Sequence, residues 1–371
     1  MLPPLTQGGS HAHSHRRPMR TTALLMMAGA IVATGPAAGQ VPDLDQRIAL
    51  FARYVDPLRA QLGIPGLSAA VVSGGRVVWE GGFGYADLER RIPATADTPY
   101  RIASITKTFT STLLLQCVER GTLNLDQPMR SFGATVPDPA ATVRQVLAMA
   151  SESPAGSRYL YDGDRFATLT PVVEACARMS FRQALRAEIL DRVAMTGSVP
   201  GHDLEAPSAQ LAADFDDATL ARYRSVIARL AKAYTSNGDR ATLADYPPRG
   251  INAAAGLIST VRDLAGYSVA IDRGILVRSQ TQAIAWTPFA LSSGQASPYG
   301  LGWFTQTTNA GRTVWHYGLW PTFSSLLLKV PARDVTLILL ANSDGLSARF
   351  PLANGDVMVS PFARAFIAAV K

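Results

Sequence analysis

The sequence predicts an α/β fold, or α+β in finer terms, in which strands from both ends of the chain form one antiparallel sheet with an inserted helical lobe. Near the N-terminal end, two β-type runs at 67–72 and 76–79 flank the turn Ser73-Gly74-Gly75 and predict a hairpin. Further strands are expected at 313–317, 323–330 and 335–341. Because the two groups can complete a sheet only together, we expect one α/β unit rather than two independent domains.

Helical periodicity dominates the middle of the chain, from about 104 to 285. Two sets of residues each share one helix face: Phe109, Leu113, Leu114, Cys117 and Val118 in the first, and Val172, Val173, Cys176 and Ala177 in the second. The first set predicts an amphipathic helix that runs to about Arg120 and is closed by Gly121. The range 203–245 is too mixed in pattern to assign beyond helices and loops. We expect a cleft between the helical lobe and the sheet.

The first 39 residues have the layout of a secretory signal peptide. A basic stretch at 16–20 precedes an apolar stretch at 21–35, and small residues follow at 37–39. We expect cleavage at the end of this segment, which would leave a hydrolase domain of residues 40–371 in the periplasm or outside the cell. The pair Arg16-Arg17 could indicate the twin-arginine route, but the residues after it lack the usual hydrophobic character, so ordinary secretion is favoured.

Composition excludes several classes of protein. The chain has 371 residues, of which 47% are hydrophobic and 17% are charged, so it can bury a large core. Its longest apolar run has 15 residues and belongs to the predicted signal. Spanning a bilayer takes roughly 18, so no integral membrane segment is expected in the mature chain. The net charge is +7, but without the three signal arginines only 32 basic residues face 28 acidic ones, which argues against nucleic acid as a partner.

Cysteine and histidine are scarce, which limits the possible sites. Cys117 and Cys176 are the only cysteines, and both lie in apolar helical patterns, so two buried thiols are favoured over a disulfide bridge. Three of the five histidines belong to the predicted signal, which leaves His202 and His316. A zinc site or a Ser-His-Asp triad would have to use one of these two. We expect no metal or organic cofactor and look for other bases.

Ser104-Ile105-Thr106-Lys107 lies just before the first predicted helix and has the clearest chemistry in the chain. Positions three apart share a helix face, so the amine of Lys107 can reach the hydroxyl of Ser104. The start of a helix favours negative charge on that oxygen, and a desolvated lysine can accept the proton of a serine. By itself, the pattern is better explained without catalysis, as an N-cap serine followed by a solvated lysine.

The surrounding residues resemble the serine β-lactamase and penicillin-binding protein superfamily. The stretches that carry the likeness, in order, are 64–66, 100–109, 121–128, 256–264 and 299–303. The likeness is strongest to the branch of class C β-lactamases, D-alanyl-D-alanine carboxypeptidases and related esterases, and it extends from Ile64 to Leu340. It implies an exported serine hydrolase in which Ser104 attacks the carbonyl of a small-molecule or peptide substrate and water releases the acyl-enzyme.

The second motif of that family, Tyr-x-Asn, matches the segment that begins at Tyr161. The resemblance implies that Tyr161, as a phenolate stabilised by Lys107, accepts the proton of Ser104 and later hands it to the leaving group. Without the resemblance, Tyr159 and Tyr161 would be read as packing aromatics.

The chain departs from the family at several positions of this region. Gly163 stands where the motif has asparagine, so recognition of amide substrates is expected to be weakened. Upstream, Met149, Ala150 and Glu152 replace three residues of the family's His-Thr-Ser-Gly, which is expected to alter the rim of the site. Asp162 could restore some polarity, although an aspartate in a loop is by default a turn residue.

The third motif, Lys-Thr-Gly or His-x-Gly in relatives, matches the three residues from His316 to Gly318 on a predicted strand. The resemblance implies that His316 lines the cleft opposite Ser104 and helps to polarise it. Gly318 permits close backbone approach. The N–H groups of Leu319 and Ser104 would then form the oxyanion hole.

We therefore expect an exported serine hydrolase, with esters or peptide-like substrates favoured over β-lactams because of Gly163. Two alternatives stay open. One is a catalytically degenerate protein that keeps the fold and binds cell-wall peptide without turnover. The other is an enzyme that hydrolyses β-lactams or acts as a D-alanine carboxypeptidase.

Overall fold

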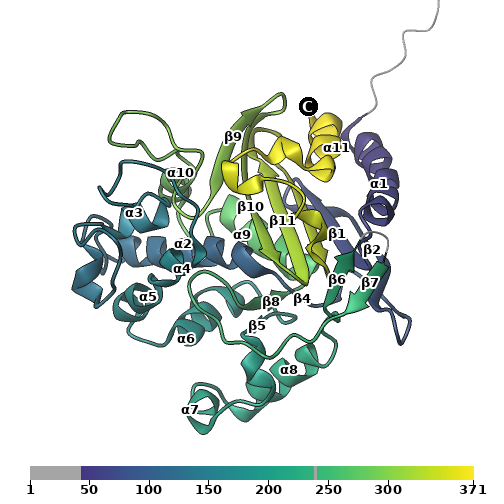
Figure 1. Ribbon diagram of the computed structural model, residues 1–371, viewed down its shortest axis with the longest axis horizontal. Coiled ribbons are helices and arrows are strands. Elements are labelled where there is room, and N and C mark those ends of the chain that lie inside the picture. Colours follow the sequence, from purple (N-terminus) through teal and green to yellow (C-terminus); the bar gives the residue numbers. More distant parts are fainter. Residues whose placement is uncertain (1–42, 238–239) are drawn as a thin grey trace, which may run out of the picture. The chain divides into compact units, whose positions relative to one another are not determined.

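A seven-stranded antiparallel sheet forms the centre of the computed structural model, which describes residues 43–237 and 240–371 (Figure 1). In sheet order its strands are β3 (Ile92–Pro93), β2 (Arg76–Asp87), β1 (Gly66–Ser73), β12 (Val335–Ala341), β11 (Phe323–Val330), β10 (Gly311–Trp320) and β9 (Phe304–Thr308). β1 pairs with β12 and places Leu67 opposite Ala341. The expected antiparallel sheet built from both ends of the chain is confirmed. The predicted signal peptide lies outside the described residues.

Two smaller sheets accompany the large one. The first has the order β4 (Tyr100–Arg101), β8 (Leu257–Ser259) and β5 (Val199–Pro200), and the second is a hairpin of β6 (Tyr234–Asn237) and β7 (Arg240–Leu243). β4 leads into η1 (Ala103–Ile105), which is one turn of 3-10 helix. β4 is an edge strand that pairs with β8, and β8 pairs with β5 on its other side, so backbone hydrogen bonds to this small sheet fix the chain that enters the turn.

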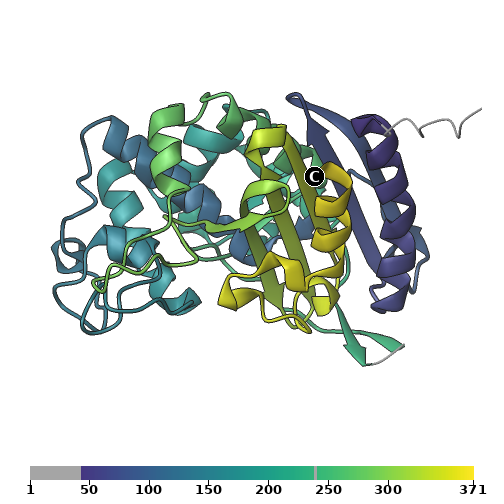
Figure 2. The same cartoon turned by 90° about the horizontal axis from the view of Figure 1, so that it is seen from above.

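Helices cover both faces of the large sheet. α1 (Leu44–Gln61) and α11 (Pro361–Val370) pack together on one face, and α9 (Val261–Asp272) lies on the other (Figure 1; Figure 2). β11 and β12 are accordingly buried along their whole length. No helix in the described ranges combines the length and the apolar character that crossing a bilayer requires.

The expected helical lobe lies beside the sheet and is confirmed. Its helices are α2 (Thr106–Glu119), α3 (Val143–Leu147), α4 (Gly163–Ala167), α5 (Thr170–Ala177), α6 (Phe181–Leu185), α7 (Ala209–Ala212), α8 (Asp217–Ile227) and α10 (Ser279–Ala285). Single turns connect elements at η2 (Met129–Phe132), η3 (Arg186–Leu190), η4 (His202–Glu205), η5 (Pro331–Arg333), η6 (Asp344–Leu346), η7 (Leu352–Asn354) and η8 (Val357–Val359). The unassigned range 203–245 thus holds two helices and the β6–β7 hairpin, whose strands the pattern did not predict.

α2 is buried on every side, so the expectation of an amphipathic helix is wrong. Every residue from Thr106 to Cys117 is buried. The serine and threonine hydroxyls that look like a polar face in the sequence are bonded inside the core; the Oγ of Ser111, for example, donates to the carbonyl of Leu301 at 2.6 Å. The predicted end of the helix is confirmed, with Gly121 in the left-handed region at a φ of 72°.

Cys117 and Cys176 form a disulfide bridge, so the expectation of two free thiols is wrong. Their Cα atoms lie 5.9 Å apart, within the range that a bridge requires. The bridge joins α2 to α5, which pack against each other in the helical lobe. The sequence places the two cysteines 59 residues apart, and only the packing of the two helices brings them together.

Candidate active site

Ser104 and Lys107 meet as the sequence predicts. Ser104 lies in the η1 turn and Lys107 in the first turn of α2. The Nζ atom of Lys107 donates a hydrogen bond to Ser104 Oγ at 2.9 Å and another to the carbonyl of Ala254 at 3.1 Å. A serine hydroxyl and a lysine amine therefore touch at the N-terminal end of a buried helix.

The turn that carries Ser104 is held in an unusual backbone conformation. Ala103 has a φ of 47°, a left-handed value that costs a residue with a side chain about 1 to 3 kcal/mol. Its carbonyl accepts a hydrogen bond of 2.7 Å from the Thr106 hydroxyl. On the other side, Gly318 of β10 packs so closely that a Cβ there would lie 3.0 Å from Ala103 Cβ and would overlap the carbonyl of Ile102. Glycine is thus required at 318, as its place in the motif implies.

Burial changes the charge state of Lys107. The side chain is 1% exposed, and this desolvation lowers its pKa to about 7, against smaller raising effects of Asp162 and Asp164. Near neutral pH, a large fraction of Lys107 is therefore uncharged. An uncharged amine beside a serine hydroxyl can accept its proton.

Tyr161 enters the same site, as the sequence predicts. Its ring lies between Phe304 and Tyr317, with centroid distances of 5.6 Å and 5.7 Å, and Lys107 Nζ lies 5.3 Å from its ring centroid. Its hydroxyl oxygen is buried and no described group bonds to it at standard geometry. Burial, reinforced by Tyr317, raises the pKa of Tyr161 well above its usual value, and the smaller influence of Ser104 lowers it. Tyr161 is therefore a neutral phenol rather than a phenolate.

The altered rim has a structural role. The backbone N–H of Leu160 donates to the carbonyl of Met149 at 2.8 Å, and that of Asp162 approaches Met149 Sδ at 3.4 Å, so Met149 brackets the segment that carries Tyr161. Asp162 is the N-cap of α4. It acts in the site through its charge rather than as a replacement for the missing asparagine.

Gly163 leaves open space next to the lysine. A Cβ at this position would lie 3.8 Å from Lys107 Nζ, an ordinary van der Waals distance, and nothing else would lie within 4 Å. A side chain at 163 would thus point toward the amine, which is where the family's asparagine is expected.

His316 is not where the resemblance placed it. It is fully buried and is not among the residues that line the cavity at Ser104. Its Nε2 atom lies 2.8 Å from the hydroxyl of Tyr299, and its Nδ1 atom lies 2.7 Å from the carbonyl of Tyr317. Burial, followed by the nearby Lys107, lowers the pKa of His316 well below its usual value. Its ring centroid lies 6.1 Å from that of Tyr161, so it supports that ring instead of lining the cleft.

Ser104 opens onto a cavity of about 380 Å³ between the helical lobe and the sheet. Lys107, Tyr161, Gly163 and Leu319 also line it, so the second predicted oxyanion donor lies in the same cavity as the nucleophile. The predicted cleft is confirmed, and its volume suits a small substrate.

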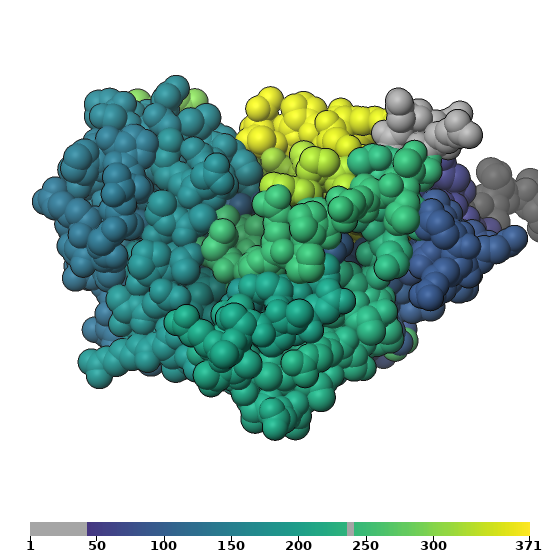
Figure 3. All heavy atoms as spheres, turned by 60° about the horizontal axis from the view of Figure 1, so that its bottom comes forward, coloured from purple at the N-terminus to yellow at the C-terminus, as the bar shows by residue number. Residues whose placement is uncertain are grey.

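A further part of the cavity wall was not predicted from the sequence. It is formed by Arg101, His202, Tyr246, Arg249 and Trp320. Figure 3 shows the green segment around residue 245, which supplies part of this wall, lying across the face between the teal helices and the yellow C-terminal region. No local signal predicts this part of the wall, since 203–245 has no clear periodicity and Arg101 belongs to the motif that contains Ser104.

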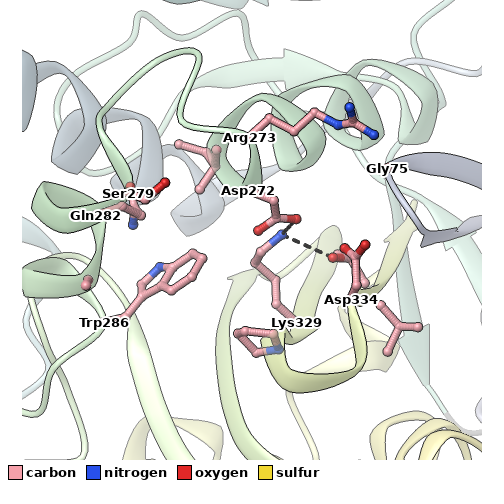
Figure 4. A pocket seen from close by; sticks show the side chains of 13 residues that line it. Gly75, Asp272, Arg273, Ser279, Gln282, Trp286, Lys329 and Asp334 are labelled. Atoms are coloured by element: carbon pink, nitrogen blue, oxygen red, sulfur yellow. Dashed lines mark hydrogen bonds and ion pairs between the residues drawn. The ribbon is translucent and has the colours of Figure 1, made fainter.

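A second cavity, also of about 380 Å³, lies at the other end of β11 (Figure 4). Lys329 reaches its wall and is fully buried, with Nζ 2.8 Å from Asp272 and 3.1 Å from the hydroxyl of Thr336. This buried ion pair ties β11 to α9. The second cavity is separate from Ser104, and its charge is accounted for by packing between the sheet and the helix. No group of three His, Cys, Asp or Glu side chains in the described ranges could hold a metal ion.

Comparison with known proteins identifies the family. The sequence model of the family described as Beta-lactamase matches residues 51–357, most of the chain. The chain belongs to the β-lactamase family. The resemblance to the serine β-lactamase and penicillin-binding protein superfamily is thereby confirmed.

The relatives either have low sequence identity to this chain or match it over only a short segment. Penicillin-binding protein 4* of Bacillus subtilis is 20% identical over 307 residues, which cover 73% of this chain and 66% of that protein. The mitochondrial serine β-lactamase-like protein LACTB of Bos taurus is 36% identical over 95 residues, which are 24% of this chain and only 17% of the bovine protein. Most of the length of that relative therefore has no counterpart in the match.

Solved structures support the fold. The octameric penicillin-binding protein homologue from Pyrococcus abyssi has a TM-score of 0.67 and 21% identity, and the alignment covers 86% of this chain and 77% of that one. The structure titled SurE has a TM-score of 0.63 and 23% identity, with coverage of 84% and 76%. The antiparallel sheet with its helical lobe is thus the fold of these proteins.

Proposed function

We propose that the protein hydrolyses esters, in preference to amides, through an acyl-enzyme formed on Ser104. One observation carries the proposal: Lys107 Nζ lies 2.9 Å from Ser104 Oγ, in a buried position that brings its pKa to about 7. A lysine in that state can act as the base that a serine nucleophile needs.

The proposed reaction runs in two halves. Ser104 Oγ attacks the substrate carbonyl carbon while its proton moves to Lys107 Nζ. The backbone N–H groups of Ser104 and Leu319 bind the oxyanion, where loss of one donor costs about 3 kcal/mol in comparable sites. The bond from carbon to the leaving oxygen then breaks, and that oxygen receives the proton. Water attacks the acyl-enzyme by the same route and releases the acid.

Tyr161 takes the role of a neutral proton relay in this scheme. Because burial keeps its pKa high, it retains its proton and can donate to the leaving oxygen while it receives the proton held by Lys107. This replaces the phenolate base expected from the sequence. The position of the Tyr161 hydroxyl supports the role, since it is buried, interacts with Ser104 and belongs to a residue that lines the cavity.

Gly163 supports the preference for esters. Amides have poorer leaving groups than esters and depend more on exact polarisation of the carbonyl and protonation of the leaving nitrogen. The space beside Lys107 that an asparagine amide would fill is empty at Gly163.

The test is a comparison of the wild-type protein with Ser104→Ala on a nitrophenyl acetate. We expect the wild type to release a burst of nitrophenol and the variant to release none. Incubation of the wild type with a fluorophosphonate, followed by mass spectrometry, should locate the added mass on Ser104. Wild-type rates no higher than those of Ser104→Ala on esters, D-alanyl peptides and cephalosporins would indicate a binding protein instead. Rapid turnover of a chromogenic cephalosporin would assign β-lactam hydrolysis, and stable labelling by a fluorescent penicillin would point to a carboxypeptidase.

We also propose that the protein is exported. The bridge between Cys117 and Cys176 supports this location, because disulfides persist in oxidising compartments and are rare in the cytosol. Expression of the full chain in a bacterium with a periplasm, followed by fractionation and mass measurement, tests it. We expect an exported product that begins near residue 40 and has no free thiol. An unprocessed product confined to the cytosol would contradict the proposal.

A further inference from the structure

The second cavity, at the other end of β11 from Ser104, has polar groups in its wall that the fold leaves unpaired. The two amide atoms of Gln282 and the indole nitrogen of Trp286 are buried, and none of the three has a hydrogen-bond partner within residues 43–237 and 240–371. Both side chains line the cavity. A buried polar group without a partner costs free energy, so packing does not explain an amide at position 282.

Gln282 and Trp286 lie together at the end of α10. Gln282 belongs to the helix, and Trp286 is its C-cap residue. Figure 4 shows the two side chains on one side of the cavity, with Asp272 and Lys329 on the other. A molecule in the cavity would therefore meet the amide and the indole from the same side.

The charged groups of the lining balance one another. They are Asp272, Arg273, Lys329 and Asp334, so two positive charges face two negative ones. The three N–H groups of Lys329 are already taken up by Asp272, Ser268 and Thr336. Because the sum of these charges is zero, the cavity favours neither an anion nor a cation.

The lining offers hydrogen-bond donors and acceptors side by side. The amide of Gln282 supplies one acceptor and two N–H donors, and Trp286 supplies a further donor. Arg273 can only donate, whereas the carboxylate of Asp334 can only accept. A carboxylate or an ammonium ligand could satisfy one kind of group. Neighbouring hydroxyls satisfy both, because each hydroxyl donates once and accepts twice.

We propose that this cavity binds a neutral polyhydroxylated ring, namely one pyranose unit of a saccharide, with adjacent hydroxyls bonded to the amide of Gln282 and the indole N–H of Trp286. A cavity of about 380 Å³ is within the range of small-molecule sites. The site is separate from Ser104, so the inference does not rest on the proposed hydrolysis.

Saturation-transfer NMR on the full protein tests binding directly. The probes are methyl β-D-glucopyranoside, methyl N-acetyl-β-D-glucosaminide and myo-inositol, with cyclohexanol as a ring that has one hydroxyl. Gln282→Leu removes the amide at nearly constant size. Gln280→Leu is the matched control, because Gln280 is exposed on the same helix and does not line the cavity. We expect a glycoside to bind, with its Kd raised about tenfold in Gln282→Leu by the loss of two hydrogen bonds and unchanged in Gln280→Leu.

The probes also distinguish the sources of such a ring. Binding of a glycoside supports a saccharide, and binding of myo-inositol alone would support the polyhydroxylated class with a cyclitol in place of the sugar. If no probe binds, or if cyclohexanol binds as well as the glycosides, the cavity holds water or apolar molecules and the proposal is overturned.

Unfolding in urea separates a ligand-binding role of Gln282 from a structural one. Without ligand, the midpoint of Gln282→Leu should equal or exceed that of the wild type, because the variant removes an unpaired buried amide. The better glycoside should then raise the midpoint of the wild type more than that of Gln282→Leu. Since sugars also stabilise proteins by exclusion from their surface, the difference between the two proteins is the measure of binding. A much lower midpoint of Gln282→Leu without ligand, together with equal shifts on adding the glycoside, would show a structural role and contradict the site.

Discussion

Lys107 is the residue whose charge state decides whether the proposed chemistry can run at neutral pH. Desolvation lowers its pKa to about 7, so the amine becomes a base as the pH rises through that value. We expect kcat/KM on a neutral ester to rise with pH along a limb whose midpoint is near 7. Steady-state kinetics between pH 5 and 9 measure it. A flat profile over this range would argue against Lys107 as the base.

The same shift in pKa changes stability with pH. A solvated lysine in the unfolded chain has a pKa near 10.5, so between about 7 and 10.5 the unfolded state binds one proton more than the folded state. The stability of the wild type relative to Lys107→Met should therefore increase with pH in this window, by up to about 1.4 kcal/mol per pH unit. Urea unfolding of both proteins at pH 6, 7.5 and 9 gives the difference. A constant difference would mean that the folded pKa is not lowered.

A side chain at Gly163 could add an interaction with Lys107. In Gly163→Asn the new side chain would point at Lys107 Nζ, and its amide oxygen would accept a hydrogen bond from the ammonium. Because this favours the charged form, we expect the pKa of Lys107 to rise and the limb of the pH–rate profile to move to higher pH. Gly163→Ala is the matched control, since it adds the Cβ without the amide. An equal displacement in both variants would contradict the hydrogen bond.

At the scale of elements, the bridge between α2 and α5 supports the helix that carries Lys107. The loop closed by Cys117 and Cys176 spans 59 residues, for which the loop-entropy relation gives about 4 kcal/mol of stability. We expect the double variant Cys117→Ala/Cys176→Ala to lose a comparable free energy of unfolding, measured in urea without reductant. The wild type in reductant is the control and should approach the variant. Equal stability of the oxidised and reduced wild type would contradict a structural role for the bridge.

At the scale of the whole molecule, the two ends of the described chain close over one face of the sheet. Phe366 of α11 is fully buried, and its ring centroid lies 5.4 Å from that of Phe51 in α1. We expect Phe366→Ala to lower the free energy of unfolding by about 3 to 5 kcal/mol, the usual result of removing a buried phenyl ring. Ala368→Ser, at an exposed position of the same helix, should change it by less than about 0.5 kcal/mol. A thermal melt in which both variants unfold with the wild type would show that this closure contributes little.

Much of the fold was predictable because its signals are local. The strands at 323–330 and 335–341 match β11 and β12 to the residue, since turn residues flank each apolar run. α1 and α11 were not predicted. α2 was misjudged because hydroxyl side chains look polar in the sequence, whereas hydrogen bonds inside the core satisfy them.

The sheet built from both ends of the chain and the approach of Ser104 to Lys107 could be predicted from the residues alone, because alternation along a strand and spacing along a helix are fixed by neighbouring residues. Tertiary packing, in contrast, sets the hydrogen bond between His316 and Tyr299, the bridge between the two cysteines, and the presence of Arg101 and Arg249 in the lining of the cavity at Ser104. These facts depend on contacts between segments far apart in the chain. Burial and charge at such contacts follow from packing, which no local pattern records.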